Sequence, residues 1–125
     1  MENLVGKSHS ISMKVEEQHT ASYVGSGDMM VFATPIMIAL MENAAMSLLS
    51  LALSIEDSSV GTAVDCKHTR ATAVGAVVTA TATVDKVDGR AVEFTIVATD
   101  EKGEIGTARH TRFVVNRERF LGKLG

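Results

Sequence analysis

Hydrophobic and polar residues alternate along most of this chain, and one long apolar segment interrupts the alternation. Alternation sends successive side chains to opposite faces of an extended strand, so it predicts strands with one buried face. The first such stretch runs from His9 to Val15, where Ile11, Met13 and Val15 share a face. The polar, glycine-containing stretch from Glu16 to Asp28 predicts a loop.

The long apolar segment predicts one helix, from Pro35 to about Leu53. Thr34 and Pro35 form a start signal, because a threonine hydroxyl can cap free helix amides and proline is tolerated in the first turn. The polar stretch from Ser54 to Ser59 ends the helix. Since the helix is apolar nearly all round, we expect it to be deeply buried or covered by a partner chain.

Four further strands follow the helix, joined by short turns. We expect them at Val60 to Arg70, Ala76 to Val87, Ala91 to Thr99 and Ile105 to Val115. The expected inward positions of the first three are Val60, Val64, Cys66 and His68, then Val78, Ala80, Ala82 and Val84, then Val92, Phe94, Ile96 and Ala98. Asp88-Gly89 and Lys102-Gly103 predict hairpin turns, and such short connections make neighbouring strands antiparallel. A short helix is expected near Arg117 to Leu121.

One helix cannot cover both faces of a five-stranded sheet, but it can lie along one face while the sheet curves around it. We therefore expect an α+β hotdog fold, with one long central helix wrapped by a five-stranded antiparallel sheet. The length predicts a single domain over residues 1–125. Hotdog domains commonly pair their sheets edge to edge, so we expect a homodimer, with a tetramer as the alternative.

Composition narrows the location and the partners. The net charge of −3 argues against a nucleic-acid partner, because such proteins usually carry a basic field. The longest uncharged apolar run, Val31 to Met41, is shorter than the ~20 residues that cross a bilayer, so we expect no membrane partner. The single cysteine, Cys66, excludes an intrachain disulfide and fits a reducing compartment. Without an apolar signal core at the N-terminus, a cytoplasmic location follows.

Glu42 is the most informative candidate for chemistry. On a helical wheel it lies within about 40° of four apolar residues, so the wheel places it on the apolar face; these are Ile38, Met46, Leu49 and Leu53. A buried carboxylate is costly unless it is paired or protonated. Glu42 is therefore either a functional acid or a residue that reaches the helix edge or pairs with an arginine.

His68 and Thr34 are the next candidates. Strand alternation places His68 on the inward face, where an imidazole can act as a general base or serve as a hydrogen-bonded core residue. An inward Glu42 on the facing helix favours the first reading, because each could partner the other. Thr34 is either an N-cap or a group whose hydroxyl, beside the helix N-terminus, faces a developing oxyanion.

Other residues carry weaker signals. Gly61 either eases the start of a strand or lets a ligand approach the backbone. Cys66 is expected to be a small core residue, because nothing beside it ensures a lowered thiol pKa. His110 and Arg112 share a face of the last strand and could form a pair, a ligand contact or part of a dimer seam.

These residues also carry a family resemblance. The stretches Ala33-Thr34-Pro35 and Ala39-Leu40-Met41-Glu42 resemble the fluoroacetyl-CoA thioesterase family of hotdog proteins. The same holds for the stretches Val60-Gly61-Thr62, His68-Thr69-Arg70-Ala71-Thr72-Ala73-Val74-Gly75, Ile105-Gly106, His110 and Arg112-Phe113-Val114-Val115. The match covers nearly the whole chain. One departure lies ahead of Thr34, where the fluoroacetyl-specific member has a longer, aromatic-containing segment and this chain has Gly25 to Phe32.

The resemblance implies hydrolysis of a small acyl-CoA to free acid and CoA at a dimer interface. It implies a catalytic triad of Thr34, Glu42 and His68. We take Gly61, Phe32 and Arg112 as candidates for substrate binding. No metal and no cofactor are expected, apart from the coenzyme A of the substrate. Two other functions remain open: a non-catalytic protein that binds acyl-CoA or a small ligand, and a hotdog hydratase or dehydratase, which also uses a carboxylate and a histidine.

Overall fold

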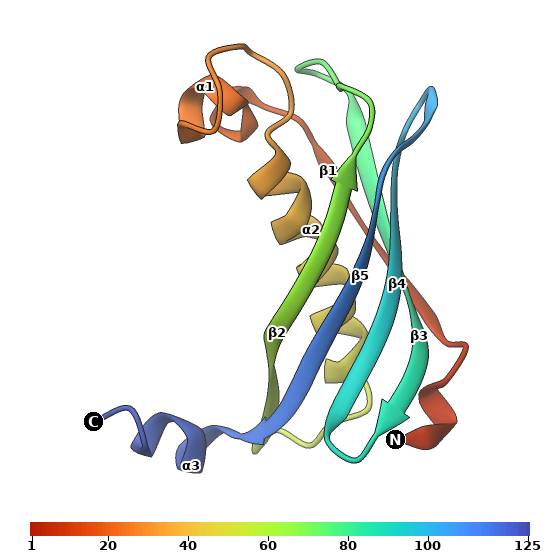
Figure 1. Ribbon diagram of the computed structural model, residues 1–125, viewed down its shortest axis with the longest axis vertical. Coiled ribbons are helices and arrows are strands. Elements are labelled where there is room, and N and C mark those ends of the chain that lie inside the picture. Colours follow the sequence, from red (N-terminus) through yellow and green to blue (C-terminus); the bar gives the residue numbers. More distant parts are fainter.

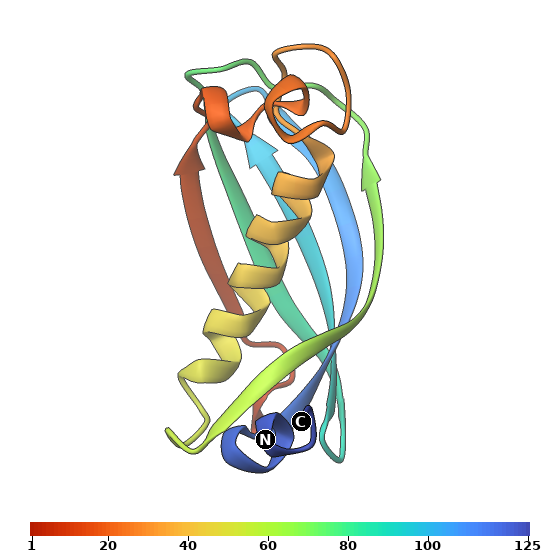
Figure 2. The same cartoon turned by 90° about the vertical axis from the view of Figure 1, so that its left-hand side faces the viewer.

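A five-stranded antiparallel sheet curves around one long helix in the computed structural model, which describes residues 1–125 (Figure 1). The helix, α2, spans Thr34–Ser50 and lies along the concave face of the sheet (Figure 2). The strands are β1 (Ser8–Lys14), β2 (Asp57–His68), β3 (Val77–Asp88), β4 (Ala91–Asp100) and β5 (Gly103–Asn116). The strand order is β1-β3-β4-β5-β2, so the predicted hotdog fold is confirmed.

Four shorter helical segments complete the chain: η1 (Glu2–Leu4), η2 (Glu17–His19), α1 (Ala21–Val24) and α3 (Arg117–Gly122). The loop predicted from Glu16 to Asp28 was wrong in its first half, because the side chains of Glu16 and His19 form a capping box and Thr20 caps α1. The α2 prediction ended a turn too late, since Leu51 already belongs to the following turn. No helix is long and apolar enough to cross a membrane.

The core lies between α2 and the concave face of the sheet. All eight predicted inward residues of β3 and β4 are buried: Val78, Ala80, Ala82, Val84, Val92, Phe94, Ile96 and Ala98. Met37 and Met41 of α2 are fully buried against this face. Gly106 of β5 lets the helix come close, because a Cβ there would lie 2.7 Å from Met37 Cε and 2.6 Å from the Lys67 carbonyl oxygen. The missing side chain at Gly106 therefore allows the start of α2 to lie close to β5.

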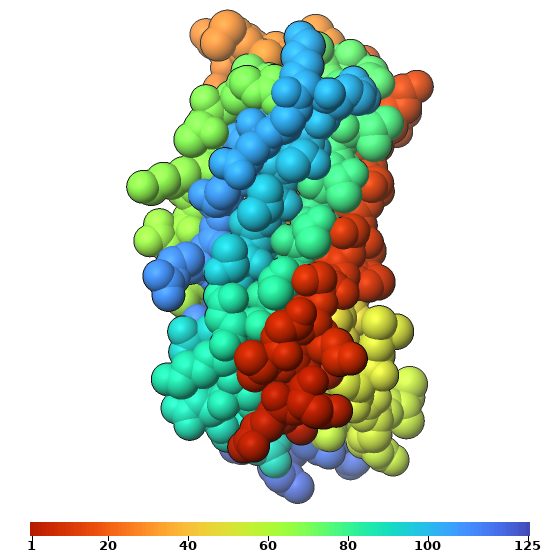
Figure 3. All heavy atoms as spheres, turned by 90° about the vertical axis from the view of Figure 1, so that its right-hand side faces the viewer, coloured from red at the N-terminus to blue at the C-terminus, as the bar shows by residue number.

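The convex face of the sheet lies on the side away from α2, and the N-terminal segment covers its lower end (Figure 3). Its β1–β3 part is a ladder of hydroxyl pairs, each with an Oγ to Oγ1 distance of 2.7 Å: Ser8 with Thr83, Ser10 with Thr81, and Ser12 with Thr79. Each hydroxyl therefore has a hydrogen-bond partner on the neighbouring strand, as expected for a solvated sheet face.

Strand β2 forms one edge of the sheet and pairs only with β5. Its register shifts between Gly61 and Ala63, which is a β-bulge. The prediction that Val60 shares the face of Val64 was therefore wrong. Val60 lies opposite Phe113 on the outer face, whereas Gly61 lies opposite Arg112 on the inner face. The bulge adds one residue and turns the strand over, so that His68 still faces inward.

Candidate active site

Thr34 and His68 meet at one end of the molecule. Thr34 is the first residue of α2, and His68 is the last residue of β2. The Thr34 hydroxyl oxygen lies 2.8 Å from His68 Nδ1, at hydrogen-bond distance. The interpretation of Thr34 as an N-cap was wrong, because Ala33 holds that position and no side chain caps the helix. The hydroxyl oxygen thus contacts the imidazole and not a helix amide.

The second ring nitrogen of His68 is available for chemistry. Nε2 is buried and has no hydrogen-bond partner in the chain. Phe32 lies edge-on to the ring, with the ring centroids 6.3 Å apart. Burial lowers the pKa of His68 below its usual 6.5, because it disfavours the charged imidazolium. The imidazole is therefore neutral at pH 7 and able to accept a proton.

An open pocket of about 290 Å³ surrounds this pair. It is lined by Ala21, Ser26, Val31, Phe32, Thr34, His68, Thr69, Arg70 and Ala71. Phe32 thus lies in the same pocket as Thr34 and His68, where a substrate contact was predicted. Its backbone amide donates to the Thr72 carbonyl oxygen at 2.9 Å, which fixes it beside the loop that follows β2.

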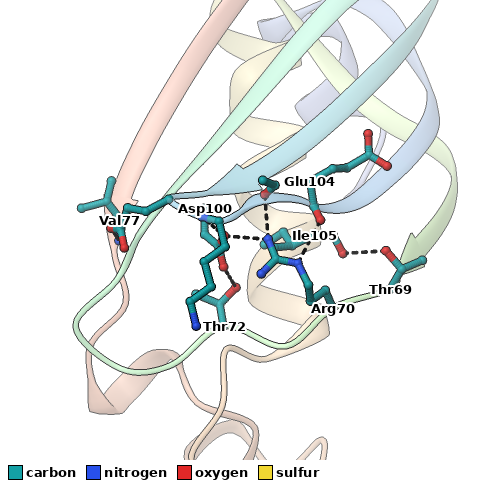
Figure 4. Close-up of polar contacts among 10 residues, drawn as sticks. Thr69, Arg70, Thr72, Val77, Asp100, Glu104 and Ile105 are labelled. Carbon is teal, nitrogen blue, oxygen red and sulfur yellow. Dashed lines mark hydrogen bonds and ion pairs between the residues drawn. The ribbon is translucent and has the colours of Figure 1, made fainter.

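A buried carboxylate anchors that loop. The Arg70 guanidinium donates to Asp100 Oδ1 at 2.7 Å, and the Thr72 hydroxyl donates to Asp100 Oδ2 at 2.9 Å (Figure 4). Burial raises the pKa of Asp100, but hydrogen bonds from Arg70, the Lys102 amide and Thr72 outweigh it and bring the pKa below its usual 3.8. Arg70, although partly exposed, is therefore anchored by Asp100 and by the Gly103 carbonyl oxygen.

Glu42 lies away from His68 within one chain. It sits two helical turns beyond Thr34, about 12 Å along the axis. Its side chain is 39% exposed, and Oε2 is 3.7 Å from an Arg112 nitrogen. The prediction that Glu42 is buried and partners His68 was wrong for a single chain. The buried side of α2 is centred on Met37, Met41 and their neighbours, and Glu42 lies at its margin.

Arg112 is a buried cation that holds Glu42 at this second position. Its side chain is 7% exposed, and it donates to Ser59 through Nε at 2.8 Å and through a terminal nitrogen to the Ser59 carbonyl oxygen at 2.9 Å. A further nitrogen lies 3.2 Å from His110 Nε2. His110 Nδ1 donates to the Ala63 carbonyl oxygen at 2.8 Å, which leaves Nε2 to accept from Arg112. The expected shared face of His110 and Arg112 is confirmed.

Gly61 provides the space that the Glu42 carboxylate occupies. A Cβ at position 61 would lie 2.7 Å from Glu42 Oε2 and 3.2 Å from His110 Cε1. Gly61 stands inside β2, beside the bulge, and not at a strand start as one reading proposed. Glu42, Gly61, His110 and Arg112 therefore form one packed polar group, separate from the Thr34–His68 pocket.

Cys66 lies between the two groups on β2. Its sulfur is 4.0 Å from the sulfur of Met41, in the partly buried packing expected of a small core residue. Burial, reinforced by the charge of Asp65, raises the pKa of the Cys66 thiol above 9.0. A thiol with a raised pKa carries little thiolate at pH 7 and is a poor nucleophile.

Two supporting residues gave no sequence signal. Ser59 belongs to the polar stretch that was predicted to end the helix, and Asp100 lies between a predicted strand and the predicted turn at Lys102-Gly103. Both are largely buried and both hold an arginine. Each lies far along the sequence from that arginine, so only the strand pairing reveals the contact.

Comparison with known proteins places the chain. The model of the fluoroacetyl-CoA-specific thioesterase family matches residues 15–118. The chain belongs to this family. The fluoroacetyl-CoA thioesterase of Streptantibioticus cattleyicolor is 39% identical over 94 residues, which are 75% of this chain and 68% of that protein. The predicted family resemblance is thereby confirmed, and the chain is a member of a thioesterase family.

Solved structures agree with this placement. A threonine-to-serine variant of a fluoroacetyl-CoA thioesterase, in complex with acetyl-CoA, superposes with a TM-score of 0.91 at 32% identity, covering 96% of this chain and 95% of that one. A phenylalanine-to-alanine variant, in complex with fluoroacetate and CoA, gives 0.88 at 33% identity over 93% and 98%. A thioesterase superfamily member from Thermus thermophilus shares the fold, with a TM-score of 0.89 at 22% identity over 96% and 89%.

Proposed function

We propose that this protein hydrolyses small acyl-CoA thioesters to the free acid and CoA, using Thr34, Glu42 and His68. The observation that carries the proposal is the Thr34–His68 hydrogen bond in an open pocket, with His68 Nε2 buried and unpartnered. A neutral imidazole with one nitrogen held in place and the other free has the arrangement of a general base. Membership of a thioesterase family supplies the reaction class.

A homodimer completes the site in this proposal. Strand β2 leaves a long edge without a partner, and such edges are normally paired or covered. Pairing two β2 strands antiparallel about their exposed middle places the Gly61 end of one strand beside the His68 end of the other. Since Glu42 stands against Gly61, Glu42 of the second copy then approaches the Thr34–His68 pair. The separation of Glu42 and His68 within one chain is what such a shared site requires.

Hydrolysis then follows from the roles of three side chains, in which Glu42 of the second copy orients His68. His68 takes a proton from water, and the water oxygen attacks the thioester carbonyl carbon. The Thr34 hydroxyl and the positive end of the α2 dipole stabilise the oxyanion. Collapse of the tetrahedral intermediate breaks the C–S bond, and His68 returns the proton to the departing thiolate. In a covalent route, the Glu42 carboxylate attacks the thioester carbonyl carbon, the C–S bond breaks, and CoA leaves as the thiolate. Water then hydrolyses the mixed anhydride, and attack of labelled water on the Glu42 carbonyl would place ¹⁸O in the Glu42 side chain.

The acyl group in this proposal is short. The pocket is bordered by Phe32 and by small or polar residues, and a relative with nearly complete coverage binds acetyl-CoA. Gly25 to Phe32 carries a single aromatic ring. We therefore propose that the protein accepts short acyl-CoAs in general and is not specific for fluoroacetyl-CoA.

The deciding experiment is free-thiol release from a panel of short, branched and aromatic acyl-CoAs. His68→Ala and Glu42→Gln should lose turnover by about 10²-fold or more, in line with the contribution of general acid–base groups. His9→Ala and Glu104→Gln are the matched controls, because their side chains form no hydrogen bond or ion pair in the chain and lie outside the Thr34–His68 pocket. Both controls should keep wild-type turnover.

Other outcomes would replace the proposal. Binding of acyl-CoA without thiol release would make this a binding protein. A change in enoyl absorbance without thiol release would make it a hydratase. Full turnover in the folded His68→Ala protein would remove His68 from the mechanism.

A further inference from the structure

Arg70 is the one charged side chain in the lining of the Thr34–His68 pocket. The other lining residues are apolar, carry a hydroxyl or, in the case of His68, are neutral at pH 7. None of them is a carboxylate. The proposed roles of Thr34, Glu42 and His68 leave this cation without a function in the reaction, so its place beside the reacting group needs an explanation of its own.

The guanidinium of Arg70 has donors left over after its contacts within the chain (Figure 4). It carries one N–H on Nε and two on each terminal nitrogen. Nε donates to the Glu104 carbonyl oxygen at 3.3 Å, and Nη2 donates to Asp100 Oδ1 at 2.7 Å and to the Gly103 carbonyl oxygen at 3.0 Å. These bonds leave both N–H groups of Nη1 without an acceptor. The side chain is 36% exposed, so a ligand can reach it.

The same contacts hold Arg70 in place. A long side chain loses conformational entropy when a ligand orders it, and that loss weakens binding. Here Asp100, which is buried, and two carbonyl oxygens already fix the guanidinium. Asp100 offsets the charge of Arg70 but does not use the Nη1 donors. An anion bound through Nη1 therefore meets a preorganised group and costs little further ordering.

We propose that Arg70 selects acyl groups that end in a carboxylate, such as the malonyl and succinyl groups of their CoA thioesters. The inference rests on the proposed function, because it concerns the acyl group held beside His68. Guanidinium N–H groups form charge-assisted hydrogen bonds with carboxylate oxygens, and these are stronger than bonds between neutral groups. The Ser26 hydroxyl, in the same lining, is a second donor for that carboxylate.

The spacing along the chain fits a short acyl group of this kind. His68 and Arg70 are two positions apart, so their Cα atoms are no more than about 7 Å apart, the span of two residues of extended chain. An acyl group that presents its thioester carbonyl to His68 can therefore turn a terminal carboxylate toward Arg70. Attack of water on the thioester would then release the dicarboxylic acid and CoA.

Two substrates of equal size isolate the effect of the charge. The acyl groups of malonyl-CoA and acetoacetyl-CoA have the same number of heavy atoms, but only the first ends in a carboxylate. The wild type should hydrolyse malonyl-CoA with a kcat/KM about tenfold above that for acetoacetyl-CoA, the scale of one hydrogen bond to a charged group. Arg70→Ala should lose most of this preference. Arg109→Ala, which removes an exposed cation outside the pocket, should keep it.

The preference, and not the absolute rate, decides the role of Arg70. If Arg70 only supports the loop that follows β2, Arg70→Ala and Asp100→Asn will slow both substrates equally, and the inference is overturned. An equal loss of affinity for both esters in Arg70→Ala would assign the residue to the CoA moiety that they share, and would overturn it as well. Arg70→Gln replaces Arg70→Ala if the alanine protein does not fold. Equal kcat/KM values in the wild type would overturn the inference without any variant.

Binding measured without turnover separates this inference from the thioesterase proposal. Calorimetry on the His68→Ala protein should give malonyl-CoA a Kd about tenfold below that of acetoacetyl-CoA, and His68→Ala/Arg70→Ala should bind the two esters equally. This pattern, together with no thiol release by the wild type, would contradict the thioesterase and support the carboxylate site. Thiol release by the wild type with equal binding of the two esters would support the thioesterase and overturn the role of Arg70.

Discussion

The Thr34 hydroxyl and the His68 imidazole are hydrogen-bonded at 2.8 Å, although they stand 34 positions apart in the sequence. The contact exists because α2 begins where β2 ends, at the same end of the curved sheet (Figure 2). It orients the imidazole through Nδ1 and leaves Nε2 facing no protein partner. One hydrogen bond thus fixes both the position of the ring and the nitrogen that is left for chemistry.

Removing the Thr34 hydroxyl should lower turnover without unfolding the protein. Thr34→Val keeps the shape of the side chain and loses the bond to His68, so kcat should fall by about 10²-fold, the scale of one lost oxyanion or orienting group. Thr34→Ser keeps a hydroxyl and should retain most activity. Thiol release and circular dichroism measure the two effects. Equal activity in the valine and serine proteins would show that the hydroxyl has no role.

The pH dependence should reflect a depressed histidine pKa. Burial lowers the pKa of His68 below 6.5, and catalysis by a base needs the neutral ring. The acid limb of kcat/KM should therefore have its midpoint below pH 6.5. A midpoint above 6.5 would contradict the assignment.

The stability of the folded protein should also decrease at acidic pH. Burial also lowers the pKa of His110, so below about pH 6.5 the unfolded chain binds protons that the folded chain excludes. The free energy of unfolding should then fall as the pH drops from 6.5. Urea denaturation at several pH values measures this, and His68→Gln should reduce the slope.

Arg112 should act as a positioning residue for Glu42. Arg112→Lys keeps the charge but cannot reach Ser59, His110 and Glu42 together, because lysine lacks the planar fork of donors. We expect kcat to fall about tenfold with a smaller change in KM, since the carboxylate loses its orientation. Arg109→Lys, at an exposed position, is the control. A change confined to KM would instead support the predicted substrate contact of Arg112.

The fold could be predicted because alternation and turn residues agree along most of the chain. The alternation of β3 and β4 correctly predicted which side chains face the core. No bulge interrupts β3 between Val78 and Val84 or β4 between Val92 and Ala98. Strand β2 could not be predicted in the same way. The bulge near Thr62 exchanges the inward and outward positions of the strand, and the sequence pattern gives no sign of this exchange.

The site could be predicted only residue by residue. Thr34 was identified by its position at the helix start, and His68 by its position on the inward face of a strand. A helical wheel gives the angles between the residues of a helix, but it does not show which side of the helix faces the core. Glu42 was therefore assigned to a buried face and to the wrong partner. Its actual partner, Arg112, comes from β5, and only the pairing of β2 with β5 places it opposite Gly61.

Gly61→Ala should separate activity from stability. The added Cβ would lie 2.7 Å from Glu42 Oε2, the end of a flexible side chain that can move away. We expect the free energy of unfolding to change by less than about 1 kcal/mol, as for adaptable packing changes. Turnover should fall about tenfold, because the carboxylate is displaced. Gly122→Ala, which meets no atom within 4 Å, is the control. Full activity in Gly61→Ala would show that the position of Glu42 is not critical.

Asp100→Asn should weaken the support behind the pocket. The side chain of Asp100 is 5% exposed, and the substitution removes its ion pair with Arg70 and weakens its bonds to Thr72 and the Lys102 amide. Because Arg70 is partly solvated, we expect a loss of about 2 kcal/mol in the free energy of unfolding and not the full cost of a buried pair.

The pH dependence of that loss identifies the charge of Asp100 as its cause. Hydrogen bonds bring the pKa of Asp100 below its usual 3.8, so its contribution to stability is present above pH 3.8 and disappears as the pH falls through the lower folded value. The difference in unfolding free energy between the wild type and Asp100→Asn should therefore shrink below about pH 4. Asp88→Asn, at the exposed end of β3, is the control. Urea denaturation between pH 3 and pH 7 measures all three proteins, and a difference that stays constant over this range would attribute the loss to shape and not to charge.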